Sequence, residues 1–143
     1  MTEQLFGRIL IATDGSEKNR AALEEGIKIA RATGATVYAV YVIDTGTFSS
    51  MSGDIPLGDT YRLFQAEAEQ AFSRIKSQAG DVKVETSILE GRPADEIVKF
   101  AAAKKIDLIV IATQGKRGLE RLLLGSVAEE IIRSAPCKVL VVK

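Results

Sequence analysis

The sequence predicts an α/β fold: an open, parallel five-stranded sheet in the order 3-2-1-4-5, with helices on both faces. Five short runs rich in β-branched residues alternate with four amphipathic segments. Four of these runs are almost continuously apolar, which is typical of parallel strands that are covered on both faces. At 143 residues, the chain is long enough for one core, so we expect a single domain over residues 1–143.

The strand-like runs differ in pattern, and the pattern indicates where each strand lies in the sheet. The third run alternates apolar and polar residues, which favours a place near the sheet edge, whereas the other four are nearly continuous apolar runs. The predicted strands span residues 8–13, 36–43, 82–88, 107–113 and 138–142.

Each segment between the strands has an apolar face at helical spacing. The four faces consist of Leu23, Ile27 and Ala30; of Phe64, Ala68, Ala71, Ile75 and Ala79; of Ala94, Ile97, Val98 and Ala101; and of Ala128, Ile131, Ile132 and Ala135. Boundary residues agree with this assignment. Ser16 is a predicted N-cap, Gly34 a C-terminal stop, Pro93 a first-turn proline, and Ser126 with Glu129 a capping box.

Composition excludes several classes of function. Lys+Arg and Asp+Glu both number 19, so nothing in the charge favours a nucleic acid or a membrane surface as partner. No apolar run approaches the roughly 20 residues of a membrane span, and the N-terminus lacks a signal-peptide pattern. The single cysteine, Cys137, is expected to be a core residue in a cytoplasmic protein. The chain has no histidine, which removes the usual general base and zinc ligand.

The predicted topology also indicates where a ligand would bind. In open parallel sheets, ligands bind at the carboxyl ends of the strands, where the strand order reverses. With the order 3-2-1-4-5, this reversal lies between the first and fourth strands. Those strands lead into Ala12-Thr13-Asp14-Gly15-Ser16 and into the loop from Ala112 to Ser126.

The loop after the fourth strand has the features of a phosphate site. Gly115 is followed by Gly125-Ser126 at the start of a helix, with Lys116, Arg117 and Arg121 between them. Backbone N–H groups and the helix dipole at such a position favour an anion. The alternative is that Ser126 only caps its helix and Gly125 only makes the turn before it. Capping and anion binding compete for the same N–H groups, so both interpretations stay open, and the spacing is not that of a Walker loop.

The turn after the first strand allows two interpretations as well. Asp14 could hold a Mg²⁺ ion that bridges phosphates, or accept a hydrogen bond from a ribose hydroxyl or an adenine edge. It could equally stabilise an ordinary strand-to-helix turn together with Ser16.

Two further segments adjoin the predicted crevice. Residues 44–58 are rich in Gly, Ser, Thr and Asp, and we expect a surface loop there that could cover the crevice. Four leucines in the fourth-strand loop need burial against a partner subunit or a closed loop: Leu119, Leu122, Leu123 and Leu124.

At these residues the chain resembles the universal stress protein family, and the resemblance covers its whole length. It is carried by RILIATDGSEKNRAALEEGIKIA, YVID, EGRPADEIVKFA and LIVIATQGKRGLERLLLGSVAEEIIRSAPCKVLVVK. The resemblance implies a Rossmann-like fold of the adenine nucleotide alpha hydrolase type. It also implies a homodimer in which the last strand, Val139–Val142, meets its copy across a two-fold axis.

One branch of this family binds ATP through the motif G-x2-G-x9-G-[ST] in the fourth-strand loop. The second and third glycines of that motif fall on Gly115 and Gly125, and the hydroxyl falls on Ser126. Ala112 departs from the pattern because it stands at the first glycine, and Gln114 stands where many members have histidine. The nucleotide-binding residues implied by the resemblance are Ala12, Thr13, Asp14, Val42, Ala112, Gln114, Gly115, Lys116, Arg117, Gly125, Ser126 and Val127, with Asp14 also holding the metal.

Together these features predict a homodimeric regulatory protein that binds ATP with Mg²⁺ or Mn²⁺ and is at most a slow ATPase. Nothing in the sequence marks a general base placed to activate water. One alternative is a nucleotide-free stress protein that acts only as a dimerising interaction module. A true ATPase or phosphotransferase is a second. A two-component receiver domain shares the topology, but the chain lacks an acidic pair after the first strand and a lysine placed like a receiver's.

Overall fold

A computed structural model describes residues 5–15, 19–46, 57–113 and 125–143. The strands and helices alternate along the chain and form one five-stranded sheet in the order β3-β2-β1-β4-β5. The elements are β1 (Arg8–Thr13), α1 (Arg20–Thr33), β2 (Thr36–Asp44), α3 (Leu57–Ala79), β3 (Val84–Gly91), α4 (Pro93–Ala103), β4 (Leu108–Ala112), α5 (Ser126–Ser134) and β5 (Lys138–Val142). All four strand pairs are parallel, so the predicted fold class and strand order are confirmed.

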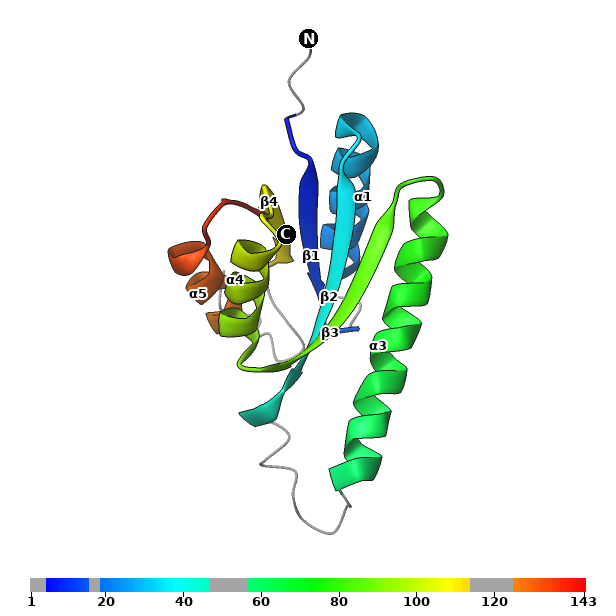
Figure 1. Ribbon diagram of the computed structural model, residues 1–143, viewed down its shortest axis with the longest axis vertical. Coiled ribbons are helices and arrows are strands. Elements are labelled where there is room, and N and C mark those ends of the chain that lie inside the picture. Colours follow the sequence, from blue (N-terminus) through cyan, green and yellow to red (C-terminus); the bar gives the residue numbers. More distant parts are fainter. Residues whose placement is uncertain (1–4, 16–18, 47–56, 114–124) are drawn as a thin grey trace.

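The sheet separates two apolar layers, each with its own pair of helices (Figure 1). Side chains alternate along β1: Ile9 and Ile11 pack with α1 and α3, whereas Leu10 packs with α4 and α5. All three are fully buried. This alternation explains why the strand sequences are apolar throughout, because a strand buried on both faces has no polar side.

The helices turn most of the predicted positions to the sheet. Most of those in α1, α3 and α4 are buried, including Leu23, Ile75 and Ile97, whereas Phe64 and Val98 are only half-buried. In α5, Ala128 and Ile131 are buried, but Ile132 is 43% exposed. The prediction that Ile132 belongs to the buried face is therefore wrong. The buried stripe of this nine-residue helix is narrow, and Ile132 lies one position beyond it.

Most predicted boundaries hold, and the differences have local causes. Gly34 ends α1 with a positive φ of 76° and donates its N–H to the Ala30 carbonyl at 2.8 Å. Pro93 begins α4, as predicted. Strand β3 runs from Val84 to Gly91 rather than over residues 82–88, because β2 extends to Asp44 and provides pairing partners as far as Gly91. The edge position predicted for this strand is confirmed.

Two predictions fall wholly or partly on residues outside the described ranges. Ser16, the predicted N-cap of the first helix, lies outside them. The described helix begins at Arg20, with Asn19 in the N-cap position. The loop predicted over residues 44–58 is shorter at both ends, because β2 includes Asp44 and α3 starts at Leu57. Residues 47–56 lie outside the described part.

A polar clamp holds β1 against β4 at the amino end of the sheet. One carboxylate oxygen of Asp107 accepts the backbone N–H groups of Gly7 and Arg8, both at 2.8 Å. In return, the Asp107 N–H donates to the Arg8 carbonyl at 2.9 Å. The Arg8 guanidinium also reaches the Lys104 carbonyl at 2.6 Å. Hydrogen bonds to a charged acceptor are stronger than neutral ones, so this clamp fixes the register of the two central strands.

Within the described ranges, no helix combines the length and the apolar character that crossing a membrane requires.

We predict that Asp107→Ala lowers the free energy of unfolding by about 1–2 kcal/mol, because two backbone donors lose a charged acceptor at a solvent-exposed site. Urea denaturation at neutral pH measures the change. Asp81→Ala is the matched control, since Asp81 is exposed in a turn and makes no hydrogen bond or ion pair with the described residues. Equal stability of the two variants would contradict a role for the clamp.

Candidate functional site

The sheet divides at its carboxyl edge, between its two central strands. The pairing of β1 with β4 ends at Ile11–Val110. Beyond that point β1 continues only along β2, as far as Thr13, and β4 continues only along β5, as far as Ala112. The ends of β1 and β4 therefore separate where the strand order reverses, which is the place where open α/β sheets bind ligands.

The turn after β1 is fixed by its own polar groups. The Asp14 N–H donates to Asn19 Oδ1 at 2.6 Å, and the Gly15 N–H donates to Thr13 Oγ1 at 3.2 Å. Asn19 is only 9% exposed although its side chain is polar. The short hydrogen bond between the Asp14 N–H and Asn19 Oδ1 therefore fixes the direction in which the chain leaves β1, and with it the backbone position of Asp14.

Gly15 is required in this turn for two reasons. Its φ of +78° lies in the left-handed region, which disfavours other residues. A Cβ at this position would also lie 3.1 Å from the Cγ atom of Glu67, on α3. The turn therefore packs closely against α3.

Glu67 is held in place by a tyrosine of the sheet. The Tyr41 hydroxyl donates to Glu67 Oε2 at 2.6 Å, and the tyrosine is only 3% exposed. Burial raises the pKa of Tyr41 far above its ordinary value, and the hydrogen bond to Glu67 raises it further. Tyr41 therefore remains a neutral donor, and it connects β2, α3 and the turn after β1.

The second half of the site is the start of α5. Gly125 is the N-cap residue, and its N–H donates to the Thr113 carbonyl at 2.7 Å. The first helical hydrogen bond runs from the Glu129 N–H to the Gly125 carbonyl at 3.0 Å. The N–H groups of residues 126–128 therefore have no acceptor within the helix.

The predicted capping box is wrong. Ser126 is the first residue inside the helix rather than its N-cap, and no side chain caps α5. Glu129 instead pairs with Arg133 one turn later, at 2.6 Å. The Ser126 hydroxyl is exposed and makes no hydrogen bond with any residue that the structure describes. Of the two interpretations of Ser126, capping does not apply, and its hydroxyl is available to a ligand.

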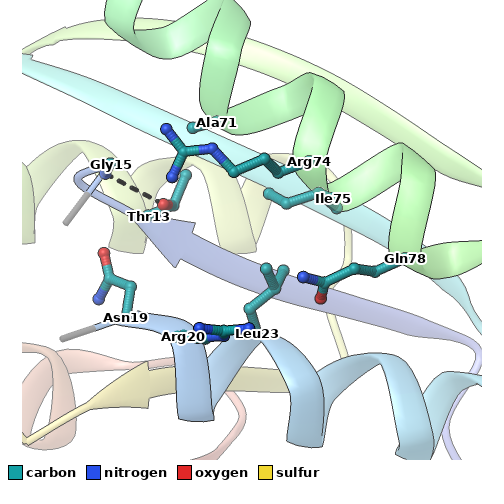
Figure 2. Close-up of a pocket in the computed structure, with 9 residues that line it drawn as sticks. All are labelled: Thr13, Gly15, Asn19, Arg20, Leu23, Ala71, Arg74, Ile75 and Gln78. Atoms are coloured by element: carbon teal, nitrogen blue, oxygen red, sulfur yellow. Dashed lines mark hydrogen bonds between the residues drawn. The ribbon is translucent and has the colours of Figure 1, made fainter. Parts of the chain in front are cut away.

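The side chains of the predicted site residues point to different faces of the sheet. Ala12 and Val42 pack against the core on the α4/α5 side, whereas Ala112 packs against the core on the α1/α3 side. Thr13 lines a cavity of about 370 Å³ between α1 and α3 (Figure 2). Val127 is 40% exposed on α5. Gln114, Gly115, Lys116 and Arg117 lie outside the described residues, as do Arg121 and the four leucines of the same loop.

Comparison with known proteins places the chain in a family. The model of the universal stress protein family matches residues 5–143. The chain belongs to this family.

Several known proteins are similar to this universal stress protein in sequence, in structure or in both. The universal stress protein MJ0531 of Methanocaldococcus jannaschii is 46% identical over 143 residues, which are 99% of this chain and 84% of that protein. The solved structure of the hypothetical protein MJ0577 is 32% identical, with a TM-score of 0.85 over 97% of this chain and 96% of that one. A universal stress protein solved in complex with cAMP is 27% identical, with a TM-score of 0.70 over 96% of both chains.

The residues that support the site of this universal stress protein cannot be recognised from the sequence. No local pattern relates Asn19 to Asp14 or Glu67 to Tyr41. The one signal available is Gly15, since a glycine in a tight turn often marks a close approach of another element. The identity of that element depends on packing of α3 against the sheet.

We predict that Tyr41→Phe makes the folded protein less sensitive to alkaline pH. The pKa of Tyr41 is raised in the folded state, so its contribution to stability is complete below the unfolded pKa of about 10 and is lost as pH rises above it. In the wild type, the titration of this one group should lower the free energy of unfolding by about 1 kcal/mol between pH 10 and pH 11. Urea unfolding at both pH values measures the loss.

Tyr61→Phe is the control for this experiment. Tyr61 also has a raised pKa, chiefly because it donates a hydrogen bond to Glu90, but it lies closer to the surface. Its replacement should change the pH dependence less. If Tyr41→Phe loses as much unfolding free energy between pH 10 and pH 11 as the wild type does, the assignment of Tyr41 as a buried neutral donor is contradicted.

Proposed function

We propose that this universal stress protein is a homodimeric, cytoplasmic regulatory protein that binds ATP with Mg²⁺ or Mn²⁺ between the ends of β1 and β4. The observation that carries the proposal is the separation of these strands after Ile11–Val110. It leaves the Asp14 turn on one side and the start of α5 on the other, at the same edge of the sheet. Switch points of this kind are preferred sites for nucleotides.

The start of α5 suits a phosphate chain. Its first-turn N–H groups have no acceptor in the helix, and the Ser126 hydroxyl is exposed. The helix dipole adds favourable positive potential at this end. The Gly125 N–H is already used by Thr113, so we assign the phosphate contacts to the amides of residues 126–128 and not to that of Gly125. The relative solved with cAMP supports an adenine nucleotide as the ligand.

Asp14 is our candidate for the metal ligand. Among the described residues, no group of three or more His, Cys, Asp or Glu side chains could hold a metal ion by itself. Mg²⁺ commonly binds through one or two carboxylates together with phosphate oxygens and water. A single aspartate beside the phosphates therefore fits a metal that arrives with the nucleotide and neutralises part of its charge.

Ala112 is compatible with this site although the family motif has glycine there. Its methyl group packs against the core formed with α1 and α3, on the opposite face from Ala12 and Val42. If adenine contacts β2 at Val42, the added methyl group points away from it. We therefore propose that alanine is tolerated at this position.

A regulatory role is favoured over efficient catalysis. The chain has no histidine, and the proposal assigns Asp14 to the metal, so we assign none of the described residues of the site as a general base that activates water. The segments after Gly46 and after Thr113 both leave the sheet at the edge where the nucleotide would bind. A nucleotide bound at this edge would change the surface that the protein presents there to other proteins.

The dimer would form through β5. This strand pairs with β4 on one side and has no neighbour on the other within the described structure. Val139–Val142 are only half-buried. An exposed apolar edge strand is a ready template for pairing with a second copy. The same edge would serve the alternative, in which the protein dimerises without binding nucleotide.

We predict that Mg-ATP raises the melting temperature of the wild type by several degrees. At a hundredfold excess over Kd, binding adds about 2.7 kcal/mol to the stability. Gly125→Val should lose this shift while its melting temperature without ligand stays close to that of the wild type. Valine can adopt the φ of −73° and ψ of 161° found at Gly125, but its side chain crowds the phosphates. Differential scanning fluorimetry measures both quantities.

Ser126→Ala and Ser134→Ala are a matched pair for this test. They lie at opposite ends of α5. Loss of the Ser126 hydroxyl should weaken ATP binding by about tenfold, and loss of the Ser134 hydroxyl should not change it. Absence of any shift in the wild type at millimolar Mg-ATP would favour the nucleotide-free alternative. So would absence of adenine nucleotide in freshly purified, denatured protein.

We also predict that Ala112→Gly changes ATP affinity by less than twofold and lowers stability by about 1 kcal/mol. The loss of stability follows from the greater freedom of glycine in a strand and from the lost core contact. Isothermal titration calorimetry and urea denaturation measure the two effects. A tenfold or greater gain in affinity would mean that the methyl group does obstruct the nucleotide.

A further inference from the structure

The cavity between α1 and α3 lies on the other face of the sheet from α5. It has a volume of about 370 Å³ and extends from the turn after β1, at Thr13 and Gly15, along the two helices to Gln78 (Figure 2). Leu23 and Ile75 provide apolar walls. This volume is within the range of small-molecule sites, and such sites combine apolar walls with a few polar groups.

The polar groups of the cavity are dominated by donors. Arg20, Arg74, Asn19 and Gln78 line it, and among the described lining residues none carries a carboxylate. In Figure 2 the Arg74 side chain runs from α3 toward the end of β1, so its guanidinium lies near the polar end of the cavity. A cavity lined by arginine side chains, with no carboxylate among its described lining residues, favours an anion.

Several of these donors are not used by the protein itself. Asn19 accepts the Asp14 N–H through Oδ1, which leaves its amide hydrogens for another partner. Arg74 makes no ion pair or hydrogen bond with the residues that the structure describes. Arg20 differs, because it pairs with Glu24 at 3.4 Å. Arg74 and Asn19 are therefore the principal anion ligands that the cavity offers.

The start of α1 adds to the positive potential. The Asn19 side chain is turned back to Asp14 and does not cap its own helix, and the first turn of α1 contains no acidic residue. The positive end of this helix is thus not neutralised by an acid of its own first turn. Two carboxylates adjoin the turn after β1: that of Glu67 on α3, which is engaged by the Tyr41 hydroxyl, and that of Asp14 in the turn itself.

We infer that this cavity is a second ligand site, which binds a small phosphorylated organic molecule. The phosphate group contacts Arg74 and the Asn19 amide, and the organic part lies against Leu23 and Ile75. The site differs from the phosphate contacts proposed above, because it lies between α1 and α3, whereas those contacts are assigned to α5 on the opposite face of the sheet. The two sites share only Thr13 among the residues named for them. The turn at Thr13–Gly15 forms a wall of the cavity and also carries Asp14.

Phenyl phosphate is a suitable probe, because it has a phosphate group and one apolar ring. Isothermal titration calorimetry on the full chain should detect its binding to the wild type. Arg74→Gln should weaken binding by about tenfold to a hundredfold, because it removes a charge-assisted contact. Arg62→Gln is the control on the same helix, since Arg62 is highly exposed and lies outside the cavity.

Two further binding measurements distinguish this site from the proposed nucleotide site. Binding of phenyl phosphate should persist in saturating Mg-ATP, and it should persist in Gly125→Val, which is expected to lose ATP. The proposal is overturned if the wild type does not bind phenyl phosphate at 10 mM, on the order of the weakest affinities of interest. It is also overturned if Arg74→Gln binds as tightly as the wild type, or if Mg-ATP abolishes binding.

Discussion

The arrangement of groups at the carboxyl edge follows from how far β1 and β4 stay paired. At the amino end, the Asp107 carboxylate ties both strands together through the N–H groups of Gly7 and Arg8. At the other end, the pairing stops at Ile11–Val110, and each strand continues with its outer neighbour. A fixed register at one end and a separation at the other place the Asp14 turn and the start of α5 at the same edge.

The turn after β1 connects two chemically different regions. It carries Asp14 directly after the last residue of β1, and it also forms a wall of the cavity lined by Arg74. Its conformation is fixed by Asn19 and by the close contact of Gly15 with Glu67. A change of packing in α3 would therefore reach Asp14 through direct contacts, which gives the two proposed sites a physical route for coupling.

The fold could be predicted because its signals are local, whereas the supporting contacts of the site could not. Apolar runs such as that of β1 reveal strands buried on both faces, and alternation in the third run placed it at the edge. By contrast, Tyr41 and Glu67 are 26 residues apart, and only tertiary packing brings them together. The prediction of a capping box was wrong for a related reason. The Gly125 N–H donates to the Thr113 carbonyl, and this tertiary contact makes Gly125 the N-cap and Ser126 the first residue inside the helix.

The hydrogen bond between Gly125 and Thr113 has a consequence for how this protein can diversify. Because it joins the point where the chain leaves β4 to the point where α5 begins, the two residues that flank positions 114–124 are held together by a bond of their own. The entropic cost of closing a loop between two joined ends grows slowly, by about 0.6 kcal/mol for each doubling of its length. Insertions, deletions or grafted recognition sequences between these two residues should thus leave the scaffold intact, so this position is suited to acquiring new specificities.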